Sequence, residues 1–243
     1  MMNSRLYLLI ILLILAGVPV TQAKEQTIGV YVALADNASQ GIVPVPAAIG
    51  NGDDPEKNLY WGTAEGLKGW FDRSKSWKLT SKNDVPAGDI LRERIYRHAR
   101  IDAVLTARAY RGAAIRHCLE DFEAAVQNGS YDLVVFIGHN GLMDFTLPVL
   151  KGRTAGKQAP VADAIVLCCK SDPYFKPRLV AGGGRPVLLT SQLMYPGAFI
   201  LDSAAEAWLG SRDPVKIRDS AARAYAKNQK LSQKSALGVF AGL

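Results

Sequence analysis

The chain is poor in the two side chains most often used as nucleophile and base, with three cysteines and three histidines in 243 residues. The cysteines lack the Cys-x-x-Cys spacing, which argues against a dithiol oxidoreductase. Neither residue type is spaced as a zinc site, so we expect no metal and no cofactor. No Gly-x-Ser-x-Gly elbow occurs, which disfavours a serine hydrolase. The residues concerned are Cys118, Cys168, Cys169, His98, His117 and His139.

Long apolar runs are also scarce, and the one that occurs, Leu6–Val20, lies near the N-terminus. It follows Arg5 and precedes the small residue Ala23, as in a secretory signal peptide that is cleaved after Ala23. The run is short for a membrane span, which needs about 20 residues. We therefore expect residues 1–23 to be removed, leaving a periplasmic or secreted protein without a stable membrane anchor. An uncleaved anchor is the alternative.

The chain has no block of charge of one sign. Its 29 basic and 22 acidic residues give a net charge of +7 and are spread along the sequence. The densest basic stretch, Arg92–Arg100, alternates with apolar residues and suits the solvated side of an edge strand. No helix-turn-helix, zinc-finger or RNA-binding pattern is present, so we expect no nucleic-acid partner. Residues 24–243 suffice for a single α/β domain with a sizeable core.

Two short apolar runs organise the centre of the chain. Residues 131–141 and 162–171 each contain a run rich in β-branched residues, as in strands that are buried on both faces of a parallel sheet. The first run delivers His139 just past its end, and the second delivers Cys169. Sites of open α/β sheets form outside the carboxyl ends of the strands. If the two strands are neighbours, an imidazole lies close to a thiol, which is the arrangement that produces a thiolate nucleophile.

The remaining pattern predicts an α/β fold, a three-layer sandwich with a mostly parallel central sheet. Glycines and prolines in residues 37–58 predict a long loop, which serves either as an ordered lid or as a rim of the substrate cleft. A helix beginning near Asp172 would place its positive end beside Cys169. Strands are expected at 27–35, 77–80, 90–96, 103–109 and 187–190, and helices at 59–72, 113–127, 173–180, 199–209 and 215–229.

The two central runs resemble the caspase–legumain–gingipain superfamily of cysteine peptidases. An apolar strand that ends in His and a nearby Gly is followed by a second that ends in Cys-Cys, and Cys169-Lys-Ser resembles the Cys-x-Ser of legumain-type members. The resemblance covers about the central 40 residues of the chain. Two positions depart from the family: Asn140 stands between His139 and Gly141, and Cys168 stands where Ala is commoner. The resemblance implies a caspase-like fold and a peptide or protein substrate.

The resemblance also implies residue roles. Cys169 would be the nucleophile and His139 would assist thiolate formation and protonate the leaving group. The backbone N–H groups of Gly141 and Cys169 would form the oxyanion hole. Ser191 and Gln192 follow a later strand and correspond to a segment that helps to bind the substrate residue at the cleaved bond.

Several choices stay open in the sequence. No third residue that would orient His139 is evident: we expect Asp144 to be an exposed loop residue and Ser171 to be a helix cap. A disulfide between Cys118 and Cys168 is one way to pair two of the three thiols. The linker Leu150–Lys157 is a candidate processing site. The alternative function is a catalytically inactive, caspase-like secreted binding or interaction protein whose 37–58 loop is a recognition surface.

Overall fold

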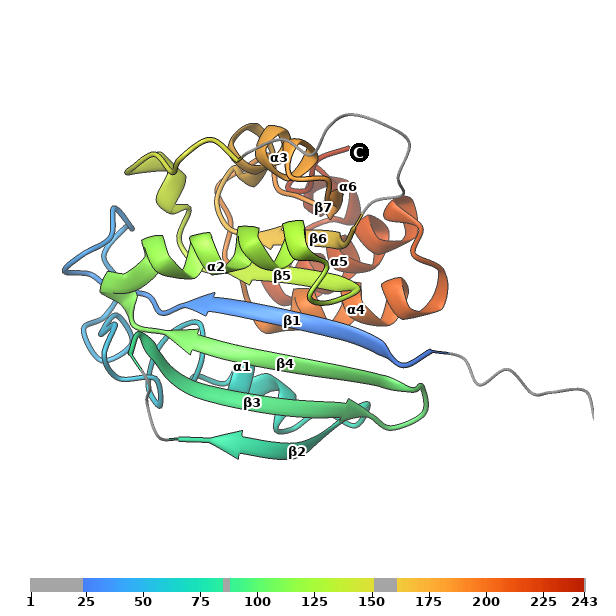
Figure 1. The fold of residues 1–243 in the computed structure, drawn as a ribbon, viewed down its shortest axis with the longest axis horizontal. Coiled ribbons are helices and arrows are strands. Elements are labelled where there is room, and N and C mark those ends of the chain that lie inside the picture. Colours follow the sequence, from blue (N-terminus) through green and yellow to red (C-terminus); the bar gives the residue numbers. More distant parts are fainter. Residues whose placement is uncertain (1–23, 85–87, 151–160, 243) are drawn as a thin grey trace, which may run out of the picture.

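The computed structural model describes residues 24–84, 88–150 and 161–242, which form one seven-stranded sheet with strand order β2-β3-β4-β1-β5-β6-β7 (Figure 1). β1 and β4 to β7 are parallel, whereas β3 runs antiparallel to both β2 and β4. The strands are β1 (Gln26–Ala33), β2 (Trp77–Asn83), β3 (Ile90–His98), β4 (Ala103–Tyr110), β5 (Leu133–Ile137), β6 (Asp163–Leu167) and β7 (Arg185–Leu188).

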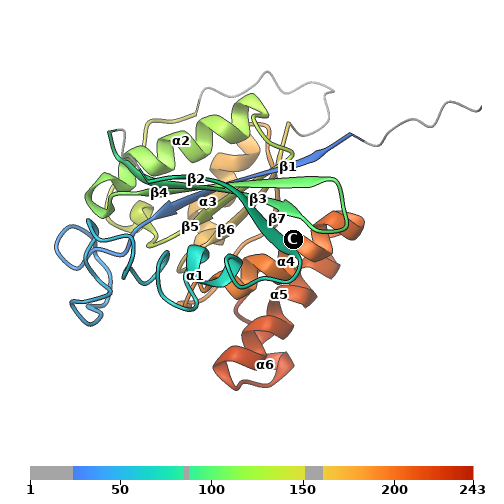
Figure 2. The same ribbon diagram turned by 90° about the horizontal axis from the view of Figure 1, so that it is seen from below.

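Helices cover both faces of this sheet, so the molecule has three layers. α2 and α3 pack on one face and α1, α4 and α5 on the other, each face with its own apolar cluster. Figure 2 shows α2 on one side of the strands and α4, α5 and α6 on the opposite side. The helices are α1 (Leu67–Phe71), α2 (Ile115–Asn128), α3 (Ser171–Ala181), α4 (Ala198–Ser211), α5 (Pro214–Gln229) and α6 (Gln233–Leu237), with short 3₁₀ turns η1 (Gly112–Ala114) and η2 (Gly141–Met143). The predicted α/β class is confirmed.

The order of the parallel strands determines where a site can form. β5 and β6 are buried along their whole length, as their β-branched composition predicts. Counted along the chain, the five parallel strands lie in the order 2-1-3-4-5, so the winding reverses between β1 and β5. Ligands of open α/β sheets bind outside the carboxyl ends of strands beside such a reversal. Those ends lie together on the left of Figure 1, where the arrowheads of β1 and β5 point.

Two expectations about local structure are wrong. The expected helix at 59–72 exists only as the single turn α1, because residues 54–66 form successive turns. These turns bring backbone against backbone: a Cβ at Gly62 would lie 1.9 Å from the carbonyl oxygen of Glu56. The stretch at 92–100 is also not an edge, since β3 lies between β2 and β4 and its buried Arg94 pairs with Asp84 at 2.6 Å.

No helix among the residues that the structure describes is long and apolar enough to cross a membrane. The predicted signal peptide, 1–23, lies outside the described residues, as do residues 151–157 of the candidate processing site.

Candidate active site

His139 and Cys169 leave the sheet at the same edge. β5 and β6 pair in parallel, with Ile137 opposite Leu167 as the last pair, so the residues that follow each strand run out side by side. Both His139 and Cys169 line one cavity of about 460 Å³. The structure therefore brings together the two side chains that the sequence selects.

Cys169 sits in a short turn between β6 and α3. The next residue, Lys170, has a φ of +48°, which turns the chain sharply so that α3 begins at Ser171. The thiol hydrogen-bonds to the backbone of Met194: Sγ donates to the carbonyl oxygen at 3.6 Å and accepts the N–H at 3.4 Å. No hydrogen bond joins it to His139 among the described residues, although catalytic hydrogen bonds are often long in ligand-free enzymes.

Asp144 orients the imidazole of His139. The sequence did not predict this contact. One carboxylate oxygen of Asp144 lies 2.7 Å from His139 Nε2, and the same oxygen accepts the N–H of Gly41 at 2.9 Å. Because an ionised carboxylate only accepts hydrogen bonds, this contact places the imidazole proton on Nε2 and leaves Nδ1 as the basic nitrogen. Asp144 is exposed, as expected, but it is also the partner of His139.

Asn140, one of the two departures from the family pattern, ties the ends of β5 and β6 together. Its buried side chain donates to the carbonyl oxygen of Cys169 at 2.8 Å and accepts the N–H of Leu142 at 3.1 Å. The first bond fixes the backbone that carries the thiol, and the second caps η2, the turn that leads to Asp144. Asn140 thus helps to place all three polar side chains of the site.

The expected role of Gly141 does not fit the hydrogen bonding. Its N–H donates to the carbonyl oxygen of His139 at 3.0 Å and is therefore occupied. Within the described part of the chain, the N–H groups of Asn140 and Cys169 have no acceptor. These two amides, one beside each reactive side chain, are available to bind an oxyanion.

Ser191 and Gln192 lie near the cavity but do not line it. The Ser191 hydroxyl donates to the carbonyl oxygen of Gly238 at 2.9 Å, and the Gln192 carbonyl accepts the N–H of Lys170 at 2.9 Å. Both contacts hold the start of segment 193–196, whose residues do form one wall. The cavity wall is thus formed by the residues that directly follow Ser191 and Gln192.

Ser171 is a buried connector rather than a helix cap. Its hydroxyl donates to the carbonyl oxygen of Val166 at 3.0 Å and accepts the N–H of Thr190 at 2.8 Å. The cap position of α3 belongs to Lys170, and no side chain caps this helix. Ser171 therefore links β6, the segment after β7 and α3, directly below the turn that holds Cys169.

All three cysteines are free thiols, so the alternative of a disulfide between Cys118 and Cys168 is not realised. Both of these residues are completely buried, and burial raises the pKa of each thiol well above its usual value. Cys169 is partly exposed. It is the one thiol that solvent reaches in the folded protein.

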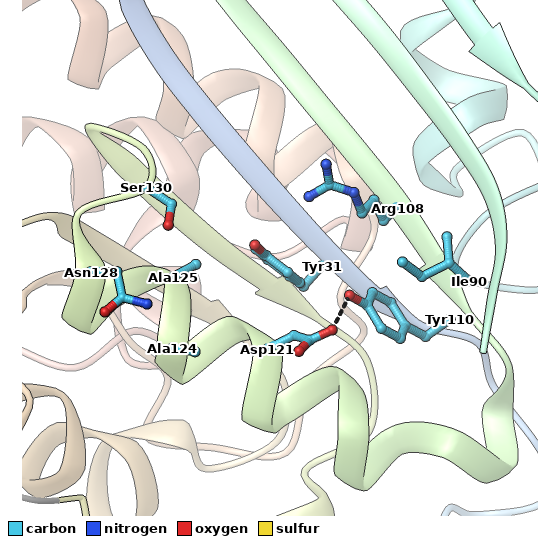
Figure 3. Close-up of a pocket in the computed structure, with 9 residues that line it drawn as sticks. All are labelled: Tyr31, Ile90, Arg108, Tyr110, Asp121, Ala124, Ala125, Asn128 and Ser130. Atoms are coloured by element: carbon cyan, nitrogen blue, oxygen red, sulfur yellow. Dashed lines mark hydrogen bonds between the residues drawn. The ribbon is translucent and has the colours of Figure 1, made fainter. Parts of the chain in front are cut away.

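A second hollow, of about 250 Å³, lies between α2 and the neighbouring strands (Figure 3). Its ionic groups already have partners: Asp121 accepts the Tyr110 hydroxyl at 2.7 Å, and Arg108 binds Glu93 at 2.8 Å. Burial raises the pKa of Tyr31, in the same hollow, to about 12, so this phenol stays neutral. The hollow contains no thiol or imidazole and is not a candidate active site.

Among the described residues, no group of three or more His, Cys, Asp or Glu side chains is placed to hold a metal ion. Comparison of the chain with models of known protein families, with curated proteins and with solved structures found no match.

Proposed function

We propose that this protein is a cysteine peptidase with a caspase-like fold that cleaves peptide bonds through Cys169 and His139. The observation that supports the proposal is the placement of both side chains in one cavity at the carboxyl ends of two paired parallel strands. The mostly parallel three-layer architecture agrees with what the resemblance implies. A signal peptide would send the enzyme to the periplasm or outside the cell.

In the proposed reaction each group has a role. Nδ1 of His139 takes the proton of Cys169, and the thiolate attacks the peptide carbonyl carbon. The developing oxyanion is bound by the free N–H groups of Cys169 and Asn140. The imidazolium then gives its proton to the leaving amine, and a water molecule hydrolyses the thioester, which restores the thiol. Asp144 keeps the proton on Nε2 throughout and stabilises the imidazolium.

The alternative is an inactive binding protein on the same scaffold. It is favoured by the Gly141 N–H, which is occupied by the His139 carbonyl, and by the contacts of the thiol with the backbone of Met194. In that case the 37–58 loop, which forms part of the cavity wall, would be a recognition surface.

Thiol alkylation distinguishes the two functions. Iodoacetamide at neutral pH is expected to modify Cys169 alone in the folded protein, because burial disfavours the thiolates of Cys118 and Cys168. We expect His139→Ala to slow this reaction roughly tenfold or more, since the variant lacks the base that removes the thiol proton. Peptide mapping by mass spectrometry at timed intervals measures the rate at each cysteine.

The matched control is His117→Ala, which removes an exposed histidine of α2 outside the cavity and should leave the rate unchanged. A Cys169 that reacts no faster than a free thiol, or at a rate indifferent to His139, would contradict the peptidase proposal and favour the binding protein.

A further inference from the structure

We infer that the substrate residue bound beside the cleaved bond is apolar, an inference that rests on the proposed peptidase function of the same cavity. Among the residues that the structure describes, no Asp, Glu, Lys or Arg side chain lines the cavity. Apart from His139, the lining consists of Cys169, glycine and proline, and of aliphatic and aromatic side chains. The latter are Ile42, Val43, Val45, Leu59, Tyr60, Met143, Leu193, Met194 and Tyr195.

The rim carries unusually exposed apolar side chains. Val43 is 84% exposed, Leu193 64% and Met143 44%. They come from three separate segments, which follow β1, β7 and β5 respectively, yet all three line this one cavity. Large apolar side chains that gather in water around a concave site mark a surface that binds an apolar ligand.

None of the described residues that line the cavity carries a carboxylate, ammonium or guanidinium group to pair with a charged substrate side chain. The Tyr60 side chain is buried and makes no hydrogen bond within the described residues, and burial raises its pKa, so the phenol stays neutral. The carboxylate beside His139, that of Asp144, is occupied by His139 and by the N–H of Gly41. A substrate carboxylate or ammonium group would lose its hydration without gaining an ion pair, which costs free energy. An apolar side chain gains by leaving water.

The test is a peptide library in which the residue on each side of the cleaved bond varies over all amino acids, with products identified by mass spectrometry. We expect kcat/KM to be roughly 10- to 100-fold higher for peptides with Leu, Met or Phe beside the cleaved bond than for those with Asp, Lys or Arg. Preferred cleavage beside charged residues, or no cleavage of any library member, would overturn the inference.

Variants at the rim connect the preference to this cavity. Val43→Asp is expected to lower kcat/KM for apolar peptides roughly tenfold. The substitution puts a charged side chain into the apolar rim against which the substrate side chain would be buried. The matched control is Val149→Asp: Val149 is also a loop valine and is 88% exposed, but it does not line the cavity. An equal loss in both variants, or none in Val43→Asp, would also contradict the inference.

Alkylation by iodoacetamide separates this inference from the proposed function, because so small a reagent does not need the apolar cavity. If Cys169 alkylation depends on His139 but cleavage favours charged residues, the apolar preference is wrong and the peptidase remains. If Cys169 is also unreactive, both fail.

Discussion

Replacing Asp144 with asparagine is expected to lower kcat for peptide cleavage by about 10²- to 10⁴-fold, the range that the loss of a histidine-orienting carboxylate can produce. Asparagine fits the same space, but its amide can donate to Nε2 and so stabilise the tautomer that carries the proton on Nδ1. That tautomer cannot take the proton of Cys169. Steady-state kinetics on a peptide that wild-type enzyme cleaves measure the effect.

A second Asp–His pair in the same molecule provides the control. Asp89 lies 2.9 Å from Nδ1 of His117, and neither residue lines the cavity. Asp89→Asn should leave kcat unchanged. Unaltered thermal stability of Asp144→Asn would show that the loss is chemical. If Asp144→Asn retains full activity, Asp144 only anchors the 37–58 loop through Gly41 and has no part in catalysis.

Asn58→Ala is expected to cost at least about 3 kcal/mol of unfolding free energy, because it leaves several buried backbone groups without partners at about 1–3 kcal/mol each. The Asn58 side chain is completely buried. It accepts the N–H groups of Ala35 and Tyr60 at 3.0 and 3.1 Å and donates to the carbonyl oxygens of Ala35 and Asn51 at 2.8 and 2.9 Å. Urea denaturation followed by circular dichroism measures the loss.

Asn37→Ala is the matched control within the same loop. Like Asn58, Asn37 hydrogen-bonds to backbone through its side chain, but it makes two bonds, both with Val45. It lies in an exposed position, where water can replace them. Its loss should cost less than about 1 kcal/mol. Equal costs for the two variants would show that the four hydrogen bonds of Asn58 are not what fixes the loop to the end of β1.

The sequence predicts those parts of the site that depend on strand ends. β-branched runs bounded by polar residues located β5 and β6, and the parallel pairing of these strands is enough to bring His139 and Cys169 to one edge. Helix boundaries were also predictable where the stop is local: α2 ends at Gly129, whose φ of +61° favours glycine.

The parts that were missed depend on contacts between distant segments. The bond from Asp144 to His139 exists because η2 turns the chain back after β5, and no periodicity signals so short a turn. The wrongly predicted helix at 59–72 has apolar residues at helical spacing. Gly62 and Gly66 within this range are, however, residues that favour tight turns. The role of Asn58 could not be predicted, because its four hydrogen bonds to Ala35, Asn51 and Tyr60 exist only once the loop is folded.

The position of β1 at the centre of the sheet has a consequence for the order of folding. β1 precedes both of its neighbours, β4 and β5, by a long stretch of chain. On a nascent chain one edge of β1 therefore stays unpaired until Tyr110 has been made, and the other until Ile137 has been made. Pairing then closes long loops, so most of the contacts that build the sheet are non-local, and folds of this kind acquire their structure slowly. The cavity is lined by residues that range from Gly41 to Pro196, so it is incomplete until the segment after β7 has also been made.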